Sequence, residues 1–219
     1  MHSEAVEDYL KAIYTLTRNQ EPASTSSLAT RLGVSAPAVS AMLKRLSEQG
    51  LVEYVPYHGT ELTASGRQEA LRTIRRHRVL ELFLVQKLGY DWDQVHDEAE
   101  RLEHVASDQL IAEMARILGE PEWDPHGAPI PGVGQTFEDP QHPALADLEI
   151  GRPALLRQVN DEDPALLRYL VELGLVPGVE VEILGRAPFG GPLRLRVGTN
   201  EQIIGQELSQ SLRVEPVTP

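Results

Sequence analysis

The sequence contains no cysteine among its 219 residues. This absence excludes disulfide bonds, thiolate zinc sites and cysteine nucleophiles, so any metal site must use histidine, aspartate, glutamate or backbone oxygen. Long apolar runs are also missing, and without a stretch of about 18 apolar residues no membrane-spanning helix is expected. Residues 2–4 are polar or acidic, and the first residues lack the apolar segment of a signal peptide. We therefore expect a soluble, cytoplasmic protein with no membrane partner.

Positive charge is scarce, because 20 Lys and Arg stand against 33 Asp and Glu, which gives a formal net charge of -13. Taken over the whole chain, this charge argues against a nucleic-acid partner. The acidic excess lies almost entirely after residue 72, and up to that point 7 basic residues stand against 8 acidic ones. The first part of the chain can therefore still approach a phosphate backbone.

Residues 1–63 are predicted to begin with three short helices. An apolar stripe of helical period over residues 9–16 predicts the first helix. The second is expected over residues 26–32. The third begins after Ser35, whose hydroxyl can cap it, and ends at Gly50.

A β-hairpin is expected next, with strands over residues 51–55 and 60–63 joined by residues 56–59. Two helices around a glycine turn, followed by a hairpin, form the winged helix-turn-helix pattern, so the third helix is the predicted DNA recognition helix. Its first outward residues are small enough to let the helix enter a major groove, and two basic residues further along can reach phosphates. The predicted DNA-binding residues are Ser35, Ala36, Pro37, Ala38, Ser40, Lys44 and Arg45.

Residues 64–119 are predicted to form two long helices, one over about 64–87 and one over about 94–118. A pair of helices buries little apolar surface by itself, so we expect this part of the chain to form a homodimer. The second helix carries His96, Glu100, Glu103 and His104 on one face, at spacings i, i+4, i+7 and i+8. Imidazole and carboxylate donors together suit Mn(II), Fe(II), Co(II) or Zn(II). A solvated charged face is the alternative that this stretch alone leaves open.

The rest of the chain is expected to form a linker and a small β domain. Residues 120–151 are rich in proline, glycine and acidic residues, which indicates an extended, partly ordered linker. Residues 152–219 contain several short apolar runs separated by glycine and proline turns, with one helix over residues 166–173. This pattern favours an SH3-like β-barrel. The expected fold class is mainly α with small β parts.

The chain resembles the diphtheria toxin repressor and manganese transport regulator family of metal-dependent repressors. The resemblance rests on EDYLKAIY at residues 7–14, VSAPAVS at 34–40, RHR with Glu81 at 76–81, HDEAERLEH at 96–104 and PHGAPIP at 125–131. It continues into the last 68 residues, where it implies a FeoA-like domain. The resemblance implies a metal-activated DNA-binding repressor of metal-uptake genes that acts as a homodimer on a palindromic operator.

The resemblance also implies two ions per chain. The primary site would use Asp8, Glu100, Glu103 and His104. The ancillary site would use His77, Glu81 and His96, and Asp163 is the nearest match to a ligand from the barrel.

Two departures from the family pattern bear on the metal. Iron-responsive members carry Cys and Met where Glu100 and Asp8 stand here, and carboxylates make the site harder, which favours Mn(II), with Fe(II) as the alternative. Short manganese-responsive members carry Glu at the position of Lys11, and a charged lysine cannot ligate, so their closely spaced two-metal cluster is not expected. His58, His126 and His142 are expected not to be ligands.

Two hypotheses of different class remain from the sequence. In the first, an ion held by Asp8 of the DNA-binding part and by Glu100, Glu103 and His104 of the helical part favours the DNA-competent state. In the second, the chain is a metal buffer or storage protein with no sequence-specific DNA binding. A carboxylate-bridged oxidase is disfavoured because its Glu-x-x-His pairs are missing, and no motif supports an enzyme.

Overall fold

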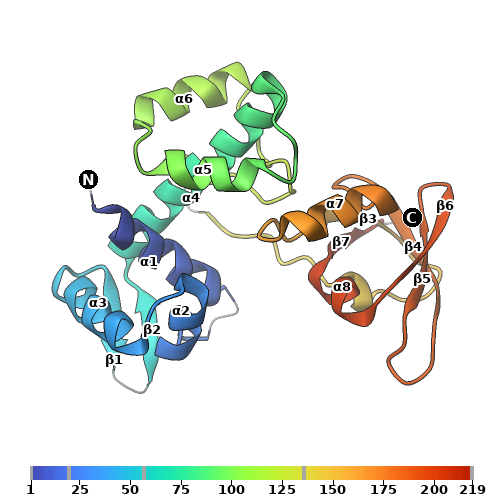
Figure 1. Cartoon of the computed structure of the whole chain (residues 1–219), viewed down its shortest axis with the longest axis horizontal. Coiled ribbons are helices and arrows are strands. Elements are labelled where there is room, and N and C mark those ends of the chain that lie inside the picture. Colours follow the sequence, from blue (N-terminus) through green and yellow to red (C-terminus); the bar gives the residue numbers. More distant parts are fainter. Residues whose placement is uncertain (1, 19–20, 56–57, 135–136, 218–219) are drawn as a thin grey trace. The chain divides into compact units, whose positions relative to one another are not determined.

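The computed structural model describes residues 2–18, 21–55, 58–134 and 137–217 (Figure 1). The chain divides into two compact units. The first comprises Met1–His77, Leu102–Asp108 and Pro131–Phe137, and the second comprises Arg78–Arg101, Gln109–Ile130 and Glu138–Pro219. The expected fold class is confirmed, since helices dominate and the strands form two small sheets.

The first unit begins with a winged helix-turn-helix, as predicted. Its elements are α1 (Glu4–Leu16), α2 (Thr25–Leu32), α3 (Ala36–Glu48), β1 (Val52–Val55) and β2 (Gly59–Leu62). The Ser24 hydroxyl caps α2 by accepting from the Ser27 N–H, and Ser35 caps α3 by accepting from the Ala38 N–H. The strands β1 and β2 pair antiparallel, with Val52 opposite Leu62. Pro56 and Tyr57 of the expected connection lie outside the described residues.

The recognition helix α3 is divided between a buried and an exposed face. Val39, Leu43 and Leu46 are fully buried and pack with α1, α2 and the strands in one apolar core. The predicted DNA-binding residues lie on the other face, where all are exposed except the half-buried Ser40. This separation follows from the helical period, which places residues three and four apart on the same side.

The two predicted helices after the wing form three helices in the structure. α4 (Ala64–Leu88) agrees with the prediction, but the single helix expected over 94–118 is wrong. α5 (Val95–Glu103) ends where His104 begins a turn, and α6 (Asp108–Ile117) starts after it. Arg72 and Arg76 both donate to the Asp108 carboxylate and hold the first residue of α6, a contact between distant residues that helical periodicity does not report.

The C-terminal part of the second unit holds an antiparallel sheet in the order β6-β5-β4-β3-β7 (Figure 1). Its elements are η1 (Leu145–Asp147), β3 (Pro153–Gln158), α7 (Pro164–Leu173), β4 (Glu180–Arg186), β5 (Leu193–Val197), β6 (Asn200–Ile204), α8 (Gln206–Ser211) and β7 (Arg213–Pro216). The predicted SH3-like β domain is confirmed, but its sheet does not close into a barrel, because β6 and β7 do not pair within the described residues. The unexpected helix α8 carries the chain from β6 to β7, which pairs with β3 at the opposite edge.

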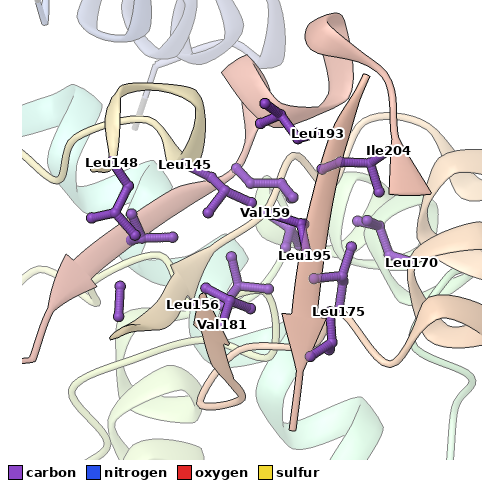
Figure 2. Close-up of a cluster of buried hydrophobic side chains, with 14 of the residues drawn as sticks. Leu145, Leu148, Leu156, Val159, Leu170, Leu175, Val181, Leu193, Leu195 and Ile204 are labelled. Carbon is purple, nitrogen blue, oxygen red and sulfur yellow. The ribbon is translucent and has the colours of Figure 1, made fainter. Parts of the chain in front are cut away.

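The core of this sheet draws on residues before the first strand. Leu145 and Leu148 point toward Leu156 of β3 and its apolar neighbours (Figure 2). Leu170 of α7 and Leu195 of β5 belong to the same buried cluster. Residues 145–148 therefore contribute to folding of the C-terminal part, although composition placed them in the linker. Among the described residues, no helix is both long and apolar enough to cross a membrane.

Candidate metal centres

The first candidate centre joins α1 to the turn after α5. The His104 Nε2 atom lies 3.0 Å from Asp8 Oδ1 and 3.5 Å from Glu103 Oε1. Asp8, Glu103 and His104, which we name the His104 cluster, are three of the four predicted primary ligands. Glu4, one turn before Asp8, also has a ligand atom within 4.8 Å of those of Asp8 and His104. Glu4 was not among the predicted ligands, although its i, i+4 spacing to Asp8 is a sequence signal for it.

Glu103 is the most enclosed member of the His104 cluster, with a side chain that is 0% exposed. Lys11 Nζ donates to its Oε1 at 2.7 Å, and His77 Nδ1 lies 2.5 Å from its Oε2. His77 was predicted as an ancillary ligand, and the structure brings it against this primary residue. Lys11 supplies positive charge to a carboxylate that would be costly to bury alone.

His104 is held from its other ring nitrogen. Its Nδ1 lies 2.7 Å from Glu7 Oε2, and Glu7 is itself buried. Burial lowers the pKa of His104, but Glu7, Glu103 and Asp8 outweigh this effect and raise that pKa above its usual value. A divalent cation can replace a proton in such surroundings, because the same carboxylates favour either positive charge.

Glu100, the fourth predicted primary ligand, lies one turn before Glu103 on α5. Its Oε1 is 3.7 Å from His96 Nε2, and its side chain is 38% exposed. His96 in turn places Nδ1 3.2 Å from Glu81 Oε1. Two of the predicted ancillary residues therefore come together in the second unit.

The second candidate centre joins the predicted ligands Glu81 and His96 to three residues that were not predicted as ligands, Asp124, His126 and Asp161. Glu81, Asp124 and His126 have ligand atoms within 4.8 Å of one another, and all three are buried. Asp161 Oδ2 lies 3.8 Å from His96 Nδ1 and 4.0 Å from His126 Nδ1. We name Glu81, His96, Asp124, His126 and Asp161 the Glu81 cluster.

The neighbours of His126 indicate which of its two ring nitrogens carries a proton. Its Nε2 lies 3.0 Å from the Trp92 carbonyl oxygen, which can only accept, so Nε2 carries the proton. In the neutral ring Nδ1 then carries the lone pair, and it faces Glu81, whose Oε2 is 3.7 Å away. The buried atoms His126 Nδ1 and Asp124 Oδ2 have no hydrogen-bond partner in the described part of the chain. A divalent cation that replaces the Nδ1 proton would find a nitrogen lone pair beside the Asp124 carboxylate, whose Oδ2 also lies 3.6 Å from Arg78 Nε.

The pKa values of two residues in the Glu81 cluster, Asp124 and His126, are raised above their ordinary values. Burial and the neighbouring Glu81 carboxylate raise the pKa of Asp124 to about 7. Burial lowers the pKa of His126, but Glu81, Asp161 and Asp124 outweigh it and raise that pKa to about 9. In the metal-free protein the cluster therefore retains protons that compensate its crowded carboxylates.

Backbone contacts hold His126 in this position. Asp124 Oδ1 accepts from the N–H groups of His126 and Ala128, at 2.9 and 2.8 Å. Gly127 has φ +84, and a Cβ atom there would meet the Arg157 carbonyl oxygen at 1.7 Å. Only glycine fits, because the loop lies directly against β3.

Asp163, the weakly matched barrel ligand, is the N-cap of α7. Its Oδ1 accepts from the N–H groups of Ala165 and Leu166. The carboxylate that reaches the Glu81 cluster is that of Asp161, two residues earlier. His126 was set aside as a linker histidine, although Asp124 and His126 flanking a proline were a weak local signal.

Three family models match successive parts of the chain. The model of the iron dependent repressor N-terminal DNA binding domain matches residues 1–60. The model of the iron dependent repressor metal binding and dimerisation domain matches residues 63–132, and the FeoA domain model matches residues 144–216.

Full-length relatives and solved structures are also similar to this chain. The iron-dependent repressor IdeR of Mycobacterium tuberculosis is 31% identical over 98% of both chains. A structure described as a manganese-dependent transcriptional repressor complex with manganese has a TM-score of 0.88 and 39% identity, and the match covers 97% of this chain and 100% of that one. ScaR with bound Zn2+ has a TM-score of 0.84 and 32% identity, over 97% and 99% of the two chains.

Fold, clusters and comparisons together define a metal-dependent transcriptional repressor. The chain belongs to the iron-dependent repressor family, whose members include the diphtheria toxin repressors. This membership decides between the two hypotheses from the sequence in favour of the repressor over the metal buffer. The named relatives are repressors and not enzymes.

Proposed function

We propose that this repressor responds to Mn(II), which is held by Asp8, Glu100, Glu103 and His104, and that the Glu81 cluster holds a second ion. The observation that carries the proposal is the convergence of Asp8 and Glu103 on His104 Nε2, at 3.0 and 3.5 Å. One imidazole nitrogen among carboxylate oxygens is a hard, oxygen-rich donor set. Sets of this kind suit Mn(II) better than softer ions.

A bound divalent cation would supply positive charge at the point where Asp8, Glu103 and His104 meet. Asp8 lies on α1, which packs against α2 and β2 of the DNA-binding part. Glu103 and His104 lie at the end of α5 and in the turn after it. Without that charge, Lys11 and His104 compensate the carboxylates, so α1 is held less firmly to the turn. We propose that firm attachment of α1 favours the DNA-competent state, which satisfies the condition for allosteric coupling.

DNA recognition is proposed to occur through the exposed face of α3. Its small residues allow close approach to base edges, and Lys44 and Arg45 reach phosphates. In a homodimer the two copies of α3 would contact two half-sites, so the operator is proposed to be palindromic, in double-stranded DNA upstream of metal-uptake genes. The proposed division of the chain is 1–63 for DNA binding, 64–119 for metal binding and dimerisation, 120–151 for the linker and 152–219 for the FeoA-like domain.

The test is operator binding at controlled free Mn(II). Fluorescence anisotropy of a labelled promoter fragment is expected to show tight binding with Mn(II) and weak binding with excess chelator. The variant Glu103→Gln is expected to lose the response to Mn(II), because it removes the central carboxylate. Glu113→Gln is the matched control, since Glu113 is an exposed carboxylate on α6 that pairs with Arg116. Equal DNA affinity with chelator and with Mn(II) would contradict the proposal.

Operator binding with Mn(II) and with Fe(II) must be compared directly to decide which ion activates the protein. The same titration is run anaerobically with each ion buffered at the same free concentrations. Mn(II) is expected to give full operator binding at micromolar free concentration, because the cluster contains no thiolate or thioether ligand. If only Fe(II) supports binding in this range, the metal assignment is wrong and the site assignment stands.

A further inference from the structure

The carboxylate of Glu7 is buried next to the proposed metal site and has no role in the function described so far. Its side chain is 4% exposed, whereas that of the adjacent Asp8 is 33% exposed. A buried carboxylate is costly unless charged or hydrogen-bonding groups surround it. Glu7 has two such partners: His104 Nδ1 lies 2.7 Å from its Oε2, and Arg76 Nη1 lies 3.7 Å from its Oε1.

Arg76 is in turn held in one orientation. It is 2% exposed, and its Nε and Nη2 donate to Asp108 Oδ1 at 3.0 and 2.8 Å. Its Nη1 also lies 3.5 Å from the Glu103 carbonyl oxygen. The guanidinium therefore connects Glu7 of α1 with both ends of the turn that carries His104. Because the Arg76 guanidinium is planar and held in place, it limits the positions that the Glu7 carboxylate can take.

The contact between Glu7 and His104 determines which ring nitrogen is open. A carboxylate can only accept, so the proton between them belongs to Nδ1 of the imidazole. Nε2, which lies 3.0 Å from Asp8 Oδ1, is then the nitrogen whose proton an ion can replace, because Nδ1 keeps its proton for Glu7. An outer carboxylate that accepts from a ligating histidine fixes the ring orientation and makes the other nitrogen more basic.

We propose that Glu7 is a positioning residue for the metal site, which holds His104 in the tautomer whose Nε2 faces Asp8 and is itself held by Arg76. This inference rests on the proposed role of His104 as a ligand. It assigns Glu7 no direct contact with the ion. A purely structural role would require only that Glu7 compensate Arg76, and would leave the His104 tautomer and the metal affinity unaffected by a neutral replacement of the same shape.

The test variant is Glu7→Gln, which keeps the size of the side chain. An amide presents either an acceptor oxygen or a donor N–H to Nδ1, so it no longer dictates the tautomer. Mn(II) affinity, measured by competition with a fluorescent chelator, is expected to fall about 10- to 100-fold. Glu48→Gln is the matched control, because Glu48 is an exposed carboxylate at the end of α3 in the same unit. Unchanged affinity in folded Glu7→Gln would overturn the inference.

A measurement on the unaltered chain keeps the inference testable if Glu7→Gln does not fold. Long-range ¹H–¹⁵N correlation spectra of the Zn(II)-loaded protein report the state of each ring nitrogen, and His104→Ala assigns the His104 signals. The expected pattern is a proton on Nδ1 and a metal-shifted Nε2. A proton on Nε2 would overturn the inference.

The controls also separate this inference from the proposed function. His104→Ala and Asp8→Ala are each expected to lose high-affinity Mn(II) binding. If both variants bind Mn(II) as the unaltered chain does, the proposed site is wrong. If both lose binding while Glu7→Gln keeps it, the site stands and only the role of Glu7 is wrong.

Discussion

Replacement of Lys11 by methionine is predicted to tighten Mn(II) binding at the His104 cluster. In the metal-free protein the Lys11 ammonium donates to Glu103 Oε1 at 2.7 Å, and the Glu103 side chain is fully buried. A divalent cation that binds this oxygen must displace the ammonium or approach beside it, and like charges repel in either case. Methionine has a similar length and no charge, so Lys11→Met removes the competitor and keeps much of the packing.

The expected size of the effect follows from the contact that is lost. A hydrogen bond between charged groups contributes about 1.5–3 kcal/mol. The Lys11 side chain is 20% exposed, so solvent screens the pair and the lower end of this range applies. Since about 1.4 kcal/mol corresponds to a factor of ten, the Kd for Mn(II) should fall about tenfold. The metal-free protein should lose about 1.5 kcal/mol of stability, because Glu103 keeps its buried charge and loses a donor.

Two assays check these values together. Chelator competition gives the Kd for Mn(II), and urea denaturation with and without Mn(II) gives the free energy of unfolding. Lys87→Met is the matched control, because it removes the same charge from an exposed position near the end of α4. The reasoning is refuted if Lys11→Met binds Mn(II) no more tightly than the unaltered chain while Lys87→Met is also unchanged.

Three further predictions concern the loop at residue 127, the pH response and the recognition helix. Gly127→Ala should lower the free energy of unfolding, measured by urea denaturation, by more than about 3 kcal/mol, because its Cβ would overlap the Arg157 carbonyl oxygen at a left-handed φ. The control Gly119→Ala, with φ +82 and nothing within 4 Å of the added Cβ, should lower it by only about 1 kcal/mol. Equal losses in the two variants would contradict this account. The pKa of Asp124 is about 7 and that of His126 is about 9, and both lie above their ordinary values. Their bound protons therefore stabilise the folded protein fully at low pH, and this stabilisation is lost as the pH rises through these values. The urea midpoint of the metal-free protein should therefore fall from pH 6 to pH 9, while Mn(II) binding at the Glu81 cluster tightens; a flat midpoint would argue against these shifts. Lys44→Ala should weaken binding to all DNA sequences alike and reduce the salt dependence of log K by about one, measured by anisotropy, whereas a sequence-selective loss would place Lys44 at a base edge instead.

The helix-turn-helix and its exposed face could be predicted because their signals are local. Ser35 caps α3 through a neighbouring N–H, and the helical period alone separates buried Val39 from exposed Lys44. Asp8, Glu103 and His104 were predicted as ligands for a related reason, and the structure brings their side chains together. Their residue types suit a cation, and the family resemblance aligned α1 with the segment after α5.

The turn at residues 104–107 could not be predicted in the same way. Periodicity continues through this segment, and the helix ends there because Arg72 and Arg76 of α4 hold Asp108 at the start of α6. Both arginines are more than 30 residues away in sequence. Helix propensity is a weak preference that tertiary contacts override.

By itself, the sequence determined the absence of thiolate ligands, the winged helix-turn-helix and the residue types from which a hard cation site can be built. Only the tertiary structure decided that His126, Asp124 and Asp161 join Glu81, that His77 faces Glu103, and that Glu7 lies behind His104. The physical reason is the range of the interactions. Caps and periodic faces depend on residues within one or two turns, whereas these side chains meet because loops and helices distant in sequence pack together and leave buried polar atoms that must find partners.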